Sequence, residues 1–217
     1  PAGKYRMVLE QVREGRILAD AALRPSPPAC WDQLLLAHDA GYVEAVFSGT
    51  LEADVVRRIG LPWSRTLAER SRITAGGSLA AARSALSAGV SGQFAGGTHH
   101  AHRDFGSGFC VFNDLAVAAL ALLAEGRVKR IAVLDTDVHQ GDGNAAILGP
   151  DPRCFVISIH GEKNFPFRKV ASDLDIGLAD GTGDAAFLEA LASALQAVAR
   201  FEPPQPSRAW QMAPPMR

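Results

Sequence analysis

Two short apolar runs, each ending at an ionisable residue, constrain the fold of this chain most. They are Ile131–Leu134, which ends at Asp135, and Phe155–Ile159, which ends at His160. Apolar runs of this length and composition predict buried strands. Helical patterns lie on either side of both, so strands alternate with helices. The alternation indicates an α/β fold in which a parallel sheet is sandwiched between helices in three layers.

The remaining segments are expected to be mainly helical. We expect helices at residues 30–38, 41–48, 52–58, 114–125 and 184–199. Another short helix is expected to begin at Ser78, a good N-cap, and to end before Gly89. A brief apolar run at Phe94–Ala95 is expected to be a further short strand. No internal repeat is visible.

Composition narrows the class of protein. The 217 residues suffice for one large domain, and 22 Lys and Arg against 23 Asp and Glu give a net charge of −1. No basic stripe predicts nucleic-acid binding, and Leu115–Ala124 is shorter than the ~18 residues of a membrane span. No signal peptide is visible, and the three cysteines form no CxxC pair. We therefore expect a cytoplasmic protein with reduced thiols.

Two windows rich in histidine, aspartate and glycine follow predicted strands. They read GGTHHAHRDFGSGFCVFND at residues 96–114 and LDTDVHQGDGN at residues 134–144. Ligands of open α/β sheets bind beyond the carboxyl ends of the strands. Because strand side chains alternate, we expect Asp135, Asp137 and His139 to lie on one side.

The residue types in these windows suit a metal-dependent hydrolase. Asp137 and His139 supply the carboxylate oxygen and imidazole nitrogen that zinc accepts. A bound zinc ion makes hydroxide available near neutral pH. His99 and His100 supply a candidate base and a hydrogen-bonding partner. Either imidazole needs an acceptor for its second nitrogen, and Asp135 and Asp142 are available.

The other candidates in and around the windows have structural interpretations. Phe105 and Phe109 are expected to be core residues rather than substrate walls. The three remaining histidines are expected at surface or structural positions rather than as ligands: His38, His102 and His160.

Both windows closely resemble the histone deacetylase superfamily, which has the zinc-dependent arginase/deacetylase fold. Further similar stretches are KYRM at Lys4–Met7, RIGLPWS at Arg58–Ser64 and GEKNFPFRKVASDLDIGLADGTGD at Gly161–Asp184. The resemblance covers residues 4 to 202 and is greatest to the bacterial branch related to the class IV deacetylases. Gln140 stands where the commonest family pattern has a second histidine, as this branch tolerates.

The resemblance implies a role for each matching residue. It implies that Asp137 and His139 are zinc ligands and that His100 is the general base. His99 would be its electrostatic partner or general acid. The resemblance further implies two supporting carboxylates, Asp135 behind His99 and Asp142 behind His100. The implied reaction is hydrolysis of an acyl-lysine-type amide by metal-activated water.

Two further sites are implied by the same resemblance. Gly108 and Phe109 would line the acyl-lysine tunnel, with Phe165 as a weaker candidate for the opposite wall. A structural potassium ion would be held by Asp135, Ser158 and carbonyl groups near Ile159.

The C-terminal part departs from the family pattern. The family's third zinc ligand, an aspartate, and its oxyanion-binding tyrosine are both expected later in the chain. Residues 203–217 are rich in proline and contain no Asp, Glu, His or Cys, and the only tyrosines are Tyr5 and Tyr42. We therefore expect a deacetylase-like domain at residues 1–202, truncated at its C-terminus, and a tail outside the pattern at 203–217. Asp173 and Asp175 are possible substitute ligands, but we expect both in a distant loop.

Three functions remain open at this point. The first is a zinc-dependent deacylase acting on an acylated lysine of a protein. The second is a non-catalytic remnant that binds acyl-lysine or a protein partner. The third is an amidohydrolase of a small acylated amine such as an acetylpolyamine. We also expect the sheet to lack its last strands, which leaves an unpaired edge strand open to pairing with a second copy of the chain in a homo-oligomer.

Overall fold

The structure is a computed structural model that describes residues 3–19 and 22–201. The predicted tail at residues 203–217 lies outside the described residues. The elements follow in the order α1 (Gly3–Glu14), α2 (Trp31–Ala37), α3 (Ala40–Ser48), α4 (Ala53–Ile59), α5 (Arg65–Ala88), α6 (Asp114–Ala124), β1 (Ile131–Asp135), α7 (Asp142–Leu148), β2 (Cys154–Gly161), β3 (Leu174–Leu178) and α8 (Asp184–Phe201).

The three described strands form one parallel sheet in the order β1-β2-β3. Ile131 pairs with Cys154 and Asp135 with Ser158, so the carboxyl end of β1 lies against the second half of β2. The strand β3 was not predicted, because its sequence LDIGL is short and contains a charge and a glycine. Its pairing with the longer β2 makes it a strand.

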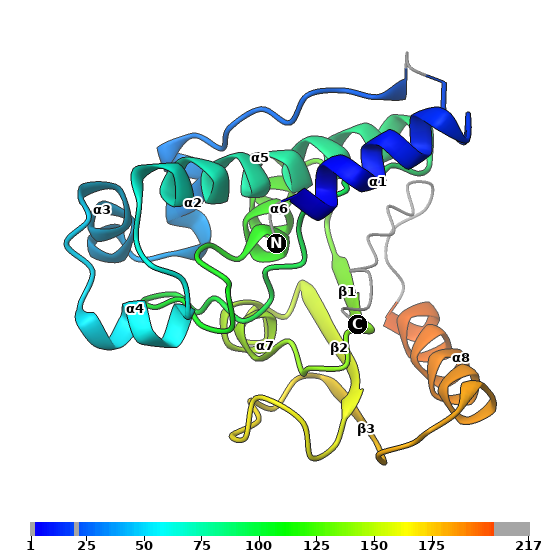
Figure 1. Cartoon of the computed structure of the whole chain (residues 1–217). Coiled ribbons are helices and arrows are strands. Elements are labelled where there is room, and N and C mark those ends of the chain that lie inside the picture. Colours follow the sequence, from blue (N-terminus) through cyan, green and yellow to red (C-terminus); the bar gives the residue numbers. More distant parts are fainter. Residues whose placement is uncertain (1–2, 20–21, 202–217) are drawn as a thin grey trace.

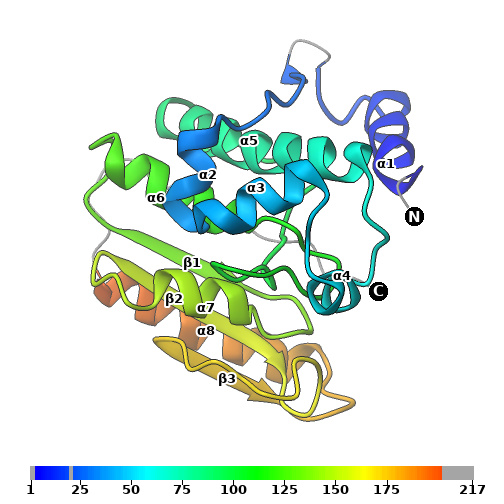
Figure 2. The same ribbon diagram turned by 90° about the vertical axis from the view of Figure 1, so that its left-hand side faces the viewer.

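Helices cover both faces of the sheet (Figures 1 and 2). Val133 and Val156 face a core shared with α2, α3, α6 and α7, whereas Leu134 and Ile157 face α8. Neighbouring strand residues point to opposite faces, so each strand contributes to both cores. The predicted three-layer α/β fold is confirmed.

The helix expected to start at Ser78 is instead the last part of α5, which begins after Ser64 and spans 24 residues. Ser64 is the true N-cap, and its hydroxyl accepts from the N–H of Leu67 at 3.0 Å. Gly76 and Gly77 lie within α5, just before Ser78. Both are buried: a side chain at Gly76 would collide with the backbone of residues 27–29, and one at Gly77 would collide with the side chains of Gln93 and Ser26. Packing has overridden local helix propensity.

The short strand expected at Phe94–Ala95 is absent, since these residues lie in a loop. The first histidine-rich window therefore follows a loop, whereas the second follows β1 as predicted. Glycines with positive φ, 145° at Gly96 and 74° at Gly97, turn the chain here instead of extending it. Among the described residues, no helix is long and apolar enough to cross a membrane.

Candidate active site

His99 and Asp135 form a buried pair that joins the two windows. Both side chains are about 1% exposed, and Nδ1 of His99 lies 2.5 Å from Oδ2 of Asp135. Burial alone would lower the pKa of His99, but the charge of Asp135 and the hydrogen bond to it outweigh burial and raise it. The pair therefore favours a protonated imidazole.

His100 pairs with the first residue of α7. Its Nδ1 lies 2.6 Å from Oδ1 of Asp142, whose other oxygen lies 3.1 Å from Nε2 of His102. Burial lowers the pKa of His100, and the hydrogen bond to Asp142 only partly opposes this. Asp142 is also desolvated, yet the hydrogen bonds from the two imidazoles hold its pKa at about 2. His100 is thus neutral, with Nδ1 bonded to the carboxylate and Nε2 left for proton transfer.

Asp137 and His139 lie side by side just after β1. Nδ1 of His139 is 3.0 Å from Oδ1 of Asp137, and Nδ1 is buried without a well-oriented hydrogen bond. Donors about 2.0–2.1 Å from one tetrahedral zinc ion would lie roughly 3.3 Å apart, so this spacing fits two ligands of one ion. The imidazole of His139 also lies 5.7 Å from that of His100, centroid to centroid. In the described part of the chain, no group of three histidine, cysteine or acidic residues completes a metal site.

The loop that leads into His99 is folded around the carboxylate of Asp114. This buried side chain accepts from the N–H groups of Gly97 (3.1 Å) and Thr98 (2.7 Å) and from the Thr98 hydroxyl (2.6 Å). The Ser78 hydroxyl of α5 donates to it as well. Asp114 was not among the predicted site residues, although an acidic residue in the first turn of a helix is a readable signal.

Gly108 and Phe109 form a tight turn that rests on the end of α4. Their N–H groups donate to the carbonyls of Arg58 (3.1 Å) and Ile59 (2.8 Å), which the helix leaves free. Both have positive φ, 52° and 65°. A Cβ on Gly108 would lie 2.5 Å from Cδ2 of His100, so only glycine fits against this ring. Phe109 is 64% exposed, and the expectation that it is a core residue is wrong.

Phe165 stands edge-on to the two central imidazoles. Its ring lies 4.9 Å from that of His100 and 6.0 Å from that of His139, both at 84°. Its Cε1 would be 3.2 Å from a Cβ on Gly108. Gly108 and Phe165 therefore face each other beside His100.

The histidines outside this cluster make structural contacts, either hydrogen bonds to the backbone or ring stacking. His38 is buried, donates from Nδ1 to the carbonyl of His102 (2.9 Å) and accepts at Nε2 from the N–H of Asn113 (2.9 Å). Burial lowers the pKa of His38 to about 4. His102 stacks on Phe105, with ring centroids 4.4 Å apart.

Two of the residues expected to hold a potassium ion, Asp135 and Ser158, lie on neighbouring strands. Ser158 lies opposite Asp135 in the register of β1 and β2, and its hydroxyl lies 3.0 Å from Nδ1 of His160. Burial lowers the pKa of His160.

The substitute ligands and the tyrosines have other partners. Asp175 lies in β3 rather than in a loop and accepts from Gln140 (2.7 Å), whereas Asp173 lies in the bend just before β3 and accepts from the N–H of Val156 (2.8 Å). The buried Tyr42 donates to the carbonyl of Val111 at 2.7 Å.

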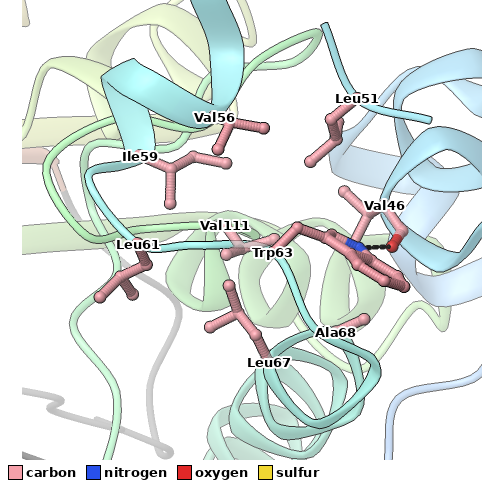
Figure 3. Close-up of a pocket in the computed structure, with 9 residues that line it drawn as sticks. All are labelled: Val46, Leu51, Val56, Ile59, Leu61, Trp63, Leu67, Ala68 and Val111. Atoms are coloured by element: carbon pink, nitrogen blue, oxygen red, sulfur yellow. Dashed lines mark hydrogen bonds between the residues drawn. The ribbon is translucent and has the colours of Figure 1, made fainter. Parts of the chain in front are cut away.

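A small apolar cavity lies apart from the imidazole cluster, between α3, α4 and the start of α5 (Figure 3). Its lining is entirely apolar apart from the indole N–H of Trp63, which donates to the carbonyl of Val46 at 2.7 Å. It contains no group for acid–base chemistry and is not the candidate active site.

Comparison with known proteins assigns the chain to a family. Residues 1–205 match the histone deacetylase domain. The chain belongs to the histone deacetylase family. An uncharacterized protein of Picosynechococcus sp. is 42% identical over 90% of this chain and 65% of its own length. Histone deacetylase 2 of Arabidopsis thaliana is 26% identical over 88% of this chain and 52% of its own.

A solved member of the histone deacetylase family has the same fold. The crystal structure of a histone deacetylase homolog from Aquifex aeolicus superposes with a TM-score of 0.78 at 25% identity. It is matched over 94% of this chain and 60% of its own length. The chain thus spans between 52% and 65% of the length of these relatives.

Proposed function

We propose that the protein to which this chain belongs is a zinc-dependent deacylase that hydrolyses acyl-lysine-type amides. The observation that carries the proposal is the arrangement of two histidine–aspartate pairs beside Asp137 and His139. Membership of the histone deacetylase family supports the same reaction class.

The two imidazoles differ in a way that suits two roles. His100, whose pKa is lowered, is the proposed general base and would accept a proton from the attacking water at Nε2. His99, whose pKa is raised, is the proposed electrostatic partner and general acid. Asp135 and Asp142 hold the two rings by Nδ1, so each presents Nε2 to the reaction.

Asp137 and His139 are the proposed zinc ligands within this chain. Bound there, zinc would polarise the amide carbonyl and make a water molecule more acidic. A catalytic zinc site normally has three protein ligands, so the proposal requires a third from outside the described residues. The tunnel walls would be Gly108, Phe109 and Phe165, and a potassium ion at Asp135 and Ser158 would brace the carboxyl end of the sheet.

A second candidate function is binding of acyl-lysine or a protein partner without catalysis. It is favoured by one observation: the described residues contain no group of three metal ligands. The aromatic walls would still accept an acyl chain in that case.

Both candidates are tested by measuring zinc content and hydrolysis together. A panel of an acetyl-lysine peptide, a long-chain acyl-lysine peptide and an acetylpolyamine distinguishes protein from small-molecule substrates. For the 217-residue chain we expect weak zinc binding and hydrolysis near background, and for the whole protein chelator-sensitive hydrolysis. Robust binding of an acyl-lysine peptide by the whole protein without turnover would favour the second function.

A further inference from the structure

The side chain of Gln140, the residue that follows His139, is buried, and its amide group makes three hydrogen bonds. Its Nε2 donates to the carbonyl of Val170 (2.9 Å) and to Oδ1 of Asp175 (2.7 Å), and its Oε1 accepts from the N–H of Val170 (3.0 Å). The side chain is only 1% exposed. Both amide hydrogens and one acceptor site are therefore used, and only an amide supplies this combination at this length.

These bonds fasten the segment between β2 and β3 to the turn that carries His139. At its start, the N–H of Gly161 donates to the carbonyl of Val138 at 2.8 Å. Near its end, shortly before β3, the segment is held by Gln140, which hydrogen-bonds to both the N–H and the carbonyl of Val170. The two ends of the segment are thus bound to the residues on either side of His139.

Phe165 lies in the middle of this fastened segment. Lys169 braces the segment internally, because its ammonium donates to the carbonyls of Asn164 (2.5 Å) and Pro166 (2.7 Å). The N–H of Phe165 also donates to the side chain of Asn164 at 2.8 Å. A segment braced in this way moves as a unit, so the bonds at its ends fix where the Phe165 ring stands.

We propose that Gln140 is a positioning residue that sets the place of Phe165 relative to His100 and His139. It thereby sets the width of the acyl channel between Phe165 and Gly108. The consequence for acyl selection rests on the proposed function, whereas the placement of the ring does not. Loss of the amide would let the segment move away and widen the channel.

The test uses the 217-residue chain and needs neither zinc nor turnover. The carbon-bound imidazole protons of His100 and His139 report the place of Phe165 by NMR, because an aromatic ring shifts nearby resonances. Gln140→Met keeps length and removes all three bonds. Gln33→Met is the matched control, since Gln33 is a half-buried amide in α2 whose oxygen accepts from the N–H of Cys30 (2.8 Å).

We expect Gln140→Met to move the His100 and His139 resonances in the same direction as Phe165→Leu, and to move them no further in a Phe165→Leu background. Exchange of the Val170 amide should become about 10-fold faster or more. Gln33→Met should change neither. Wild-type His100 and His139 resonances in Gln140→Met would overturn the proposal, even if exchange became faster.

Two variants that exchange the amide and the carboxylate between positions 140 and 175 keep the proposal testable if Gln140→Met does not fold. Gln140→Glu retains the acceptor for Val170 but sets a carboxylate against Asp175, and Asp175→Asn supplies a donor to it. The double variant should return the imidazole resonances toward wild type relative to Gln140→Glu alone. Identical spectra of the single and double variants would contradict the proposal. Absence of zinc binding or hydrolysis would count against the proposed function and leave this result unaffected.

Discussion

Nδ1 of His100 lies 2.6 Å from Oδ1 of Asp142, and this contact joins the first histidine-rich window to the N-terminus of α7. The carboxylate raises the pKa of an imidazole that burial would otherwise lower further. Burial thus keeps His100 neutral, and the pair holds Nδ1–H toward the carboxylate.

Replacing this carboxylate should make His100 a weaker base. In Asp142→Asn the hydrogen-bond geometry is retained but the charge is lost, so the pKa of His100 should fall below its wild-type value. An NMR titration of the His100 ring measures the change. Asp151→Asn, at an exposed ion pair with Arg153, is the control and should leave His100 unaffected. An unchanged or raised pKa in Asp142→Asn would show that the carboxylate does not act on His100.

His100 should also carry the proton transfer in the whole protein. His100→Ala removes the proposed base and should lower kcat by about 10²–10⁴ with little change in KM. Steady-state kinetics on an acetyl-lysine peptide measures this, with His102→Ala as a comparison that leaves His100 in place and should cost less. Wild-type turnover in His100→Ala would transfer the role of base to another residue.

His38 should make the fold sensitive to acid. Its pKa is about 4 in the folded chain and about 6.5 when unfolded, so protonation favours the unfolded state. The stability that neutral His38 contributes is complete above pH 6.5 and is lost as the pH falls toward 4. The loss amounts to about 3 kcal/mol.

Urea unfolding between pH 8 and pH 4 measures the acid effect. His38→Phe removes the titrating group along with the bonds to His102 and Asn113. It should be less stable than wild type at pH 8 but lose less stability on acidification. Equal pH slopes for the two proteins would contradict the assignment to His38.

Asp114 should be critical for stability. Asp114→Asn places an amide N–H₂ among four donors, so at least one buried donor loses its acceptor. We expect the free energy of unfolding to fall by about 2–4 kcal/mol. Asp54→Asn, at an exposed pair with Arg57, should change it by less than about 0.5 kcal/mol. A similar small change in both variants would show that the Asp114 carboxylate does not anchor the loop.

Sequence reasoning succeeded where local signals agree with packing. The apolar runs identified β1 and β2, and the helices near residues 30–48, 114–125 and 184–199 were placed to within a few residues. It failed where partners distant in sequence decide the structure. The helix expected from Ser78 begins at Arg65 instead, with Gly76 and Gly77 packed closely against other segments, and β3 exists through its pairing with β2.

The same distinction between local signals and distant partners holds for the candidate site. The need of His99 and His100 for carboxylate acceptors follows from chemistry that the sequence displays, and the resemblance implied the pairs His99–Asp135 and His100–Asp142. The structure brings these residues together. The roles of Asp114 and Gln140 depend on partners distant in sequence: Gly97, Thr98 and Ser78 for the first, and Val170 and Asp175 for the second. The sequence shows that Asp114 opens a helix, but it does not show which groups these two side chains contact.

The most direct test of the account measures the zinc dissociation constant of this chain by competition with a chromophoric chelator. The central claim is that Asp137 and His139 bind one zinc ion. Asp137→Asn and His139→Ala should each weaken binding by about 10-fold or more, while Asp54→Asn should bind as the wild type does. Wild-type affinity in both ligand variants, or no zinc binding by the unaltered chain, would contradict the account.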